Sequence, residues 1–202
     1  MSDITKLHPE VRVKCEKLIS ACTVNGLPIK ITQTLRTVAQ QEALYAQGRT
    51  APGNIVTNAR GLSYSSPHQW GVAFDFCKNV KGQEYSDIPF FQKVGALGKT
   101  LGLFWGGDFR GFVDMPHFED VKFFVNNSAQ TLRSKYGTPE KFISTWGQYN
   151  NGIEKTVANL ISDGVAADKE HWRGFLYGIS TTRPDYVRTI FDRYHNLLKK
   201  GG

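Results

Sequence analysis

Hydrophobic residues over positions 1–137 follow two periods, one typical of helices and one typical of strands. Capping and stop residues around these runs mark where each element begins and ends. The pattern predicts a helix from Pro9 to Asn25-Gly26, a strand within 27–36, a helix from Thr37 to about Gln47, a long loop over 50–67, a strand over 72–76, a helix over 88–103 and a short strand over 116–119.

The pattern changes near Thr138-Pro139-Glu140, which together make a strong helix start. Beyond that point apolar residues recur only at helical spacing, in one stripe over 153–165 and another over 186–198. We therefore expect an α+β domain over residues 1–137, followed by an all-helical region over 138–202.

One strand carries an unusual residue. Residues 66–76 read SPHQWGVAFDF, and alternation puts Val72, Phe74 and Phe76 on one face and Asp75 on the other. The run is apolar enough that Asp75 is expected to be partly buried, and a buried carboxylate needs a partner. That partner is a cation, a set of backbone N–H groups, or a metal.

Composition narrows the class of partner. The chain is 40% hydrophobic and 21% charged, as in a soluble globular protein, and its formal net charge of +7 favours an anionic partner such as a cell-envelope polymer. Because the basic residues are spread along the chain and form no block, we do not expect it to bind nucleic acid. Three cysteines without a C-x-x-C pair predict reduced, partly buried thiols.

The start of the chain, MSDITKLHPEV, lacks the charged-then-apolar pattern of a signal peptide. No apolar run approaches the roughly 20 residues that a membrane-spanning helix needs. We therefore expect synthesis in a cytoplasm, and release by some other agent if the protein acts outside it.

Two of the five histidines have acids at suggestive offsets. Asp75 lies seven residues after His68, and Asp114 lies three residues before His117. Two imidazoles and a carboxylate suit a catalytic zinc, which keeps its fourth position for water. On spacing alone, the alternative that His68 and Asp75 only hydrogen-bond to each other stays open.

Four segments, in order, resemble the zinc peptidases that cut the stem peptides of peptidoglycan. The S-x-H-x-x-G-x-A-x-D signature of that family resembles SSPHQWGVAFDF, and its second motif, with an acid three residues before a ligand histidine, resembles DMPHFE. Two further family segments resemble LRTVAQQEALYAQGRT and GLFWGGDF. The resemblance covers roughly residues 27–120. An aspartate at position 114, where vancomycin-resistance-type enzymes typically have glutamate, favours the L-alanyl-D-glutamate endopeptidase branch, which includes phage endolysins.

The resemblance implies a small antiparallel sheet with flanking helices that carries a Zn²⁺ site. The roles that it assigns are metal ligands at His68, Asp75 and His117, a general base at Asp114, an arginine that supports substrate or oxyanion at Arg36, and substrate-binding residues at Ser66 and Trp105. Trp105 fits a core position equally well. Gln41 is expected to orient its helix or loop, and Glu119 to hydrogen-bond a ligand histidine.

We therefore expect a monomeric, zinc-dependent endopeptidase that cleaves the L-Ala–D-Glu bond of the peptidoglycan stem peptide. The missing signal peptide fits a phage endolysin that reaches the wall through a membrane lesion and lyses the host, and a prophage or bacterial origin stays open. The alternatives are a carboxypeptidase or dipeptidase acting at D-Ala–D-Ala, and a catalytically silent zinc-fold module that binds the wall. Residues 138–202 either pack on the catalytic domain or bind the envelope, and the basic helix over 183–200 could touch anionic lipid.

Overall fold

The computed structural model describes residues 2–123, 129–162 and Trp172, without the side chains of 149–155 and 157. The chain forms two compact units, Met1–Trp146 and Gly147–Gly202. The stripe predicted over 186–198 and the basic helix over 183–200 lie outside the described residues. Among the described residues, none of the helices combines the length and the apolar character that crossing a membrane requires.

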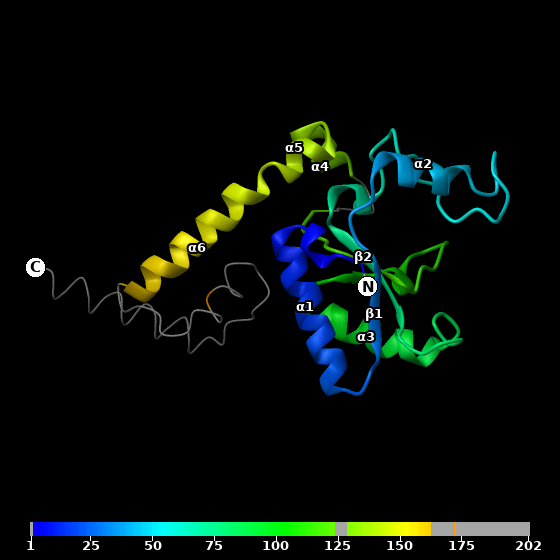
Figure 1. Cartoon of the computed structure of the whole chain (residues 1–202), viewed down its shortest axis with the longest axis horizontal. Helices are drawn as coiled ribbons and strands as arrows, with labels where there is room; N and C mark the ends of the chain where they lie inside the picture. Colours follow the sequence, from blue (N-terminus) through cyan, green and yellow to red (C-terminus); the bar gives the residue numbers. More distant parts are fainter. Residues whose placement is uncertain (1, 124–128, 163–171, 173–202) are drawn as a thin grey trace, which may run out of the picture. The chain divides into compact units, whose positions relative to one another are not determined.

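A four-stranded antiparallel sheet forms the centre of the first unit (Figure 1). Its strands run in the order β1-β2-β4-β3, and they are β1 (Ile29–Gln33), β2 (Ala73–Lys78), β4 (His117–Glu119) and β3 (Phe104–Trp105). Helices flank this sheet, so the predicted α+β class with a small antiparallel sheet is confirmed.

The pairing of β2 with β4 gives the sheet two chemically different faces. Phe74 pairs with Phe118, whereas Asp75 pairs with His117 and Ala73 with Glu119. Because successive residues of a strand point to opposite faces, the phenylalanines lie on one face, and the polar residues Asp75, His117 and Glu119 lie together on the other. The alternation predicted around Asp75 is thus confirmed, and it separates a core face from a polar face.

Helices α1 (Pro9–Val24) and α3 (Ile88–Thr100) supply the rest of the core. The rings of Phe90 and Phe91 on α3 pack against Phe76 at centroid distances of 6.2 and 5.2 Å. Most of the apolar stripe of α1, including both of its cysteines, is fully buried, and all three cysteines are free thiols as predicted. Figure 1 shows α1 and α3 beside each other, with α2 (Val38–Ala46) apart from them.

Local signals fixed most of the helix ends. Pro9 opens α1, and Thr37 and Gln40 form the predicted capping box at the start of α2. The helix predicted over 88–103 ends at Thr100, because Leu101 and Gly102 turn back on it through hydrogen bonds to the carbonyls of Gly98 and Lys99. The described part also contains the 3₁₀ helices η1 (Ile4–Lys6), η2 (Pro67–Trp70) and η3 (Gly106–Asp108), and the helices α4 (Gln130–Tyr136), α5 (Pro139–Ile143) and α6 (Trp146–Ser162).

Residues just beyond position 137 belong to the first unit. The Phe142 side chain on α5 is 2% exposed, and its ring lies 6.1 Å from Trp70 and stacks on His8 at 5.4 Å. Trp146 adds an edge contact to the Phe142 ring at 5.9 Å. Burial in this aromatic cluster lowers the pKa of His8 to about 3, because the charged imidazolium is disfavoured there.

Ending the chain at Gly137 is therefore expected to lower its melting temperature relative to a chain that ends at Trp146. The shorter chain loses Phe142 and Trp146, and truncating one buried aromatic ring alone typically costs about 3–5 kcal/mol. Thermal unfolding of the two chains, each measured beside the complete protein, tests this. Equal melting temperatures would show that the aromatic cluster contributes nothing to the stability of the first unit.

Candidate active site

The polar face of the sheet gathers the three side chains predicted to bind metal. The His68 Nε2 lies 3.2 Å from the His117 Nδ1 and 3.2 Å from the Asp75 Oδ1, and the His117 Nδ1 lies 3.0 Å from the same oxygen. Asp75 and His117 are cross-strand partners in β2 and β4, while His68 comes from η2, which leads into β2. The ligand set thus depends on one strand pairing and one short turn.

Hydrogen bonds on the far side of each imidazole fix which nitrogen faces the cluster. The His68 Nδ1 lies 2.9 Å from the carbonyl oxygen of Thr34, and the His117 Nε2 lies 3.2 Å from the Glu119 Oε2. Both oxygens can only accept, so each of these nitrogens carries the proton. When His117 is neutral, the nitrogens that face Asp75 present lone pairs, as metal ligands must.

The donor set fits a zinc ion. Two imidazole nitrogens and a carboxylate oxygen are the ligands of many catalytic zinc sites, and tetrahedral bonds of about 2.0–2.1 Å place ligand atoms roughly 3.3 Å apart. The observed separations are 3.0–3.2 Å. If all three atoms carried lone pairs, this distance would be repulsive, so the cluster requires positive charge, either a proton on an imidazole or a metal ion.

The pKa shifts of these groups agree with a need for positive charge in the cluster. Burial opposes the charged form of His117, but hydrogen bonds to Asp75 and Glu119 outweigh it and raise its pKa to about 10. Burial would raise the pKa of Asp75, but His68 and His117 lower it well below the ordinary aspartate range. Burial also lowers the pKa of His68. Asp75 therefore stays ionised and the cluster favours a cation.

Arg36 lies next to the metal-binding cluster. One of its terminal nitrogens is 3.6 Å from the Asp75 Oδ2, and the other donates a 2.8 Å hydrogen bond to the Gln41 Oε1. Its backbone N–H also donates to the carbonyl of His68, which ties the segment after β1 to η2. Burial lowers the pKa of Arg36, but an arginine begins so high that it remains charged at neutral pH.

Asp114 is held beside the cluster by a close backbone approach. Its N–H donates to the carbonyl of Gly106 at 2.9 Å, and its own carbonyl accepts from the N–H of His117 at 3.1 Å. A Cβ at position 106 would collide with the carbonyl oxygen of Asp114 and lie 2.9 Å from the His117 Cβ, so only glycine permits this turn. Burial raises the pKa of Asp114, which makes it a better proton acceptor than an exposed aspartate.

A cleft of about 430 Å³ opens over these groups. One wall is formed by the loop that follows α2, and the other by the turn between η3 and β4. Its lining residues are Arg36, Leu44, Ile55, Val56, Thr57, Asn58, Ala59, Ser65, Ser66, Pro67, His68, Asp75, Phe109, Phe112, Asp114, His117 and Glu119. The long loop predicted over 50–67 therefore supplies nearly half of the lining.

The two residues predicted to bind substrate occupy different environments. Ser66 immediately precedes η2 and lines the cleft, and its role in substrate binding stays a prediction. Trp105 does not line it: the side chain is 6% exposed, packs against Gly95 and Gly107, and donates its indole N–H to the carbonyl of Met115. Trp105 lies in the core, where it supports the turn that carries Asp114, and this position gives it no contact with the cleft.

Two charged residues, Lys14 and Asp120, had no role assigned from the sequence. Lys14 on α1 forms a buried ion pair with Asp120 at 2.6 Å, and Asp120 directly follows β4. The position of Lys14 on a largely apolar helix face was the only signal for it. Glu119 lies where the motif suggested, with one carboxylate oxygen on His117.

The known proteins that this chain resembles are peptidases. The family described as D-alanyl-D-alanine carboxypeptidase, in the peptidase M15 group, matches residues 60–120. The peptidoglycan L-alanyl-D-glutamate endopeptidase CwlK of Bacillus subtilis (strain 168) is 39% identical over 125 residues, which cover 57% of this chain and 74% of that protein. The L-alanyl-D-glutamate peptidase of Listeria phage A118 is 31% identical over 123 residues, 59% of this chain and 40% of that protein.

Among solved structures, the L-Ala D-Glu endopeptidase ChiX of Serratia marcescens matches with a TM-score of 0.43 and 20% identity. The match covers 57% of this chain and 81% of that one.

Proposed function

Since the chain belongs to the M15 family of metallopeptidases, with CwlK as a relative along most of that enzyme's length, we propose that it is a zinc-dependent endopeptidase that hydrolyses the L-Ala–D-Glu bond of peptidoglycan stem peptides. The observation that carries this proposal is the convergence of three lone-pair donors, 3.0–3.2 Å apart, in a cleft that Asp114 and Arg36 also line. The names of the Bacillus subtilis and Listeria phage A118 relatives specify a bond between L-alanine and D-glutamate.

The residues of this chain divide the reaction between them. His68, Asp75 and His117 would hold the zinc ion, which would supply the Lewis acidity that makes water a usable nucleophile at neutral pH. Asp114 takes the proton of the attacking water and returns it to the leaving amine of D-glutamate. Arg36 donates hydrogen bonds to the oxygen on which negative charge develops as the L-Ala carbonyl is attacked.

Products from defined stem peptides test the cleaved bond. Tetrapeptide and pentapeptide stems with diaminopimelate or lysine at the third position are incubated with the zinc-loaded protein and analysed by mass spectrometry. We expect free L-alanine, or muramyl-L-alanine from the intact muropeptide, and a fragment with D-glutamate at its amino end. Release of only a terminal D-alanine from a pentapeptide stem would assign the carboxypeptidase reaction instead, and intact stems would leave only a wall-binding role.

We further propose that the protein acts as a phage endolysin. Support comes from the similarity to the Listeria phage A118 peptidase, although the match covers 40% of that protein. Lysis is tested by the loss of turbidity of cells whose outer layers have been permeabilised, with and without a chelator. Chelator-sensitive clearing is expected, and undiminished turbidity with active enzyme would argue against a lytic role.

A further inference from the structure

We propose that Gln41 is a positioning residue that holds both sides of the catalytic cleft at once: Arg36 on one side and the wall segment Thr57–Ala59 on the other. The inference rests on the proposed endopeptidase function, because it concerns how that cleft is kept in its working shape. Gln41 does not line the cleft and contacts no metal-binding side chain, so it acts through its neighbours.

The Gln41 amide is fully buried and uses both of its ends. Its Oε1 accepts a 2.8 Å hydrogen bond from Arg36, and its Nε2 donates to the Ala59 carbonyl at 2.8 Å and to the Thr57 Oγ1 at 3.3 Å. A guanidinium can only donate and a carbonyl can only accept, so these partners allow a single orientation of the amide. No other side chain of this length provides one acceptor and two donors in that arrangement.

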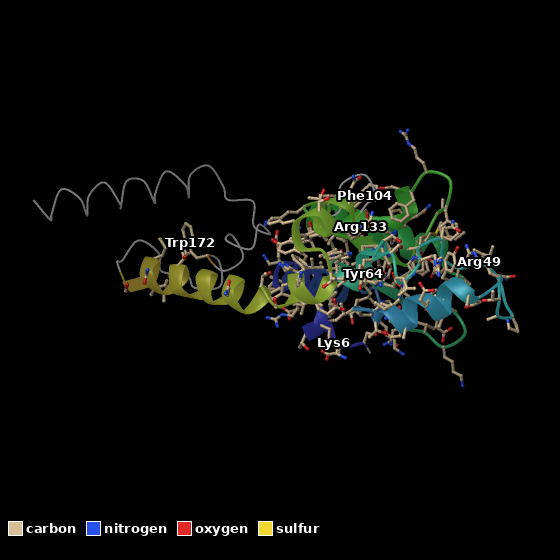
Figure 2. The ribbon with its side chains drawn as sticks, turned by 90° about the horizontal axis from the view of Figure 1, so that it is seen from above. Lys6, Arg49, Tyr64, Phe104, Arg133 and Trp172 are labelled. Carbon is tan, nitrogen blue, oxygen red and sulfur yellow. The ribbon has the colours of Figure 1, made fainter. Side chains whose placement is uncertain are left out.

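The wall segment has a second attachment just beyond the end of α2. Arg49, which follows α2 and is labelled in Figure 2, stacks on the Tyr45 ring at 4.0 Å. It donates to the Thr57 carbonyl at 3.0 Å and to the Asn58 Oδ1 at 2.9 Å. Gln41 and Arg49 thus fix the segment at both ends, and only Gln41 also reaches Arg36.

The effect of Gln41 on the reaction depends on where the Arg36 guanidinium would lie without it. Its other terminal nitrogen lies 3.6 Å from Asp75, a proposed metal ligand. Without the Gln41 acceptor, the guanidinium is free to swing towards that carboxylate and away from the developing oxyanion. Displacement of a catalytic group by about 1 Å can lower a rate by roughly 100-fold, so loss of Gln41 should act on kcat through Arg36 and on KM through the wall.

Two substitutions separate these contributions. Gln41→Met keeps the volume but removes all three hydrogen bonds, and we expect kcat to fall about tenfold or more with KM raised. Gln41→Glu keeps an acceptor for Arg36 but removes both donors to the wall. We expect it to recover most of the lost kcat while KM remains high, a split that a general loss of stability would not produce.

A double-mutant cycle with Arg36→Ala tests the coupling directly. In the Arg36→Ala background, Gln41→Met is expected to change kcat by less than about twofold, because the group that it positions is gone. The control is Gln69→Met: Gln69 is also buried and donates to the Gly61 carbonyl of the same loop, but its amide makes no hydrogen bond to Arg36. Its effect should combine multiplicatively with that of Arg36→Ala. Multiplicative effects for Gln41→Met as well would overturn the proposal.

A measurement independent of turnover distinguishes this proposal from the function on which it rests. Hydrogen exchange at residues 57–60 and the NMR signal of the Arg36 guanidinium are compared between the unsubstituted protein and Gln41→Met. Faster exchange and a shifted guanidinium signal are expected, even if the stem peptide is not the substrate. Unchanged exchange and an unchanged signal would overturn the role of Gln41, whereas an inactive unsubstituted protein would overturn only the endopeptidase assignment.

Discussion

Replacing His68, Asp75 or His117 by alanine is expected to abolish zinc binding and peptidase activity together. Purified protein should carry about one zinc per chain, and each variant should carry almost none, because a catalytic site with three protein ligands cannot lose one and hold the metal tightly. Activity should fall to background in all three variants and also after exhaustive chelation. Restoring zinc should restore activity only in the unsubstituted protein.

The same variants should lose the stabilisation that the metal provides. Zinc that binds the folded protein and not the unfolded chain raises the melting temperature according to its concentration and affinity. We expect added zinc to raise the melting temperature of the unsubstituted protein and to leave that of the three variants unchanged.

Asp87→Ala provides the matched control. Asp87 caps α3 and pairs with Lys78 at 2.7 Å, so its removal should cost about 1 kcal/mol of stability without loss of zinc. Full activity of the exhaustively chelated protein, with zinc shown to be absent, would refute the metal assignment.

Asp114→Asn is expected to lower kcat by on the order of 100-fold or more while zinc content and melting temperature are retained. The amide keeps the shape of the side chain but cannot accept a proton as a carboxylate does. The hydrogen bonds that position residue 114 come from its backbone, so the turn should survive the change. Steady-state kinetics on a defined stem peptide, with zinc measured in the same sample, checks the prediction.

The pH profile adds a second test of the same role. The base works in its ionised form, and burial raises the pKa of Asp114. Acidification should therefore protonate Asp114, and lower the activity, at a higher pH than if the base were an exposed aspartate with a pKa of about 3.9. This acid limb should be missing from the residual activity of Asp114→Asn.

Asp108→Asn is the matched control, since Asp108 lies in the adjacent η3 and pairs with Lys99 at the surface. It should keep normal turnover. Near-normal turnover in zinc-loaded Asp114→Asn would move the base role to another acid of the cleft, and Glu119 would be the first candidate.

Local patterns in the sequence predicted most of the helices and strands. Alternation predicted the face of Asp75, and the capping box predicted the start of α2, because both depend on residues close together in the chain. Trp105 shows where such patterns fail. It lies in a strand of two residues, too short for a period to indicate which way the side chain points.

Contacts between distant parts of the chain could not be predicted in this way. Lys14 and Asp120 are separated by 106 positions, and their ion pair exists only because α1 packs beside the end of β4. Gln41 stood in a family segment, but its bridging role needed the three-dimensional path of the loop that returns to it at Ala59. In the sequence, Lys14 and Gln41 could be noticed only as polar residues at positions that the hydrophobic pattern would assign to packing.

The pairing of β2 with β4 links catalysis to correct folding. A shift of one residue would bring Phe74 beside His117 and turn Asp75 towards the apolar interior, so that core and metal site would be lost in a single error. A misregistered chain therefore has no partial activity to contribute. In a refolding experiment or a library of core variants, recovered peptidase activity would count molecules with the native strand register, and the enzyme would serve as its own folding reporter.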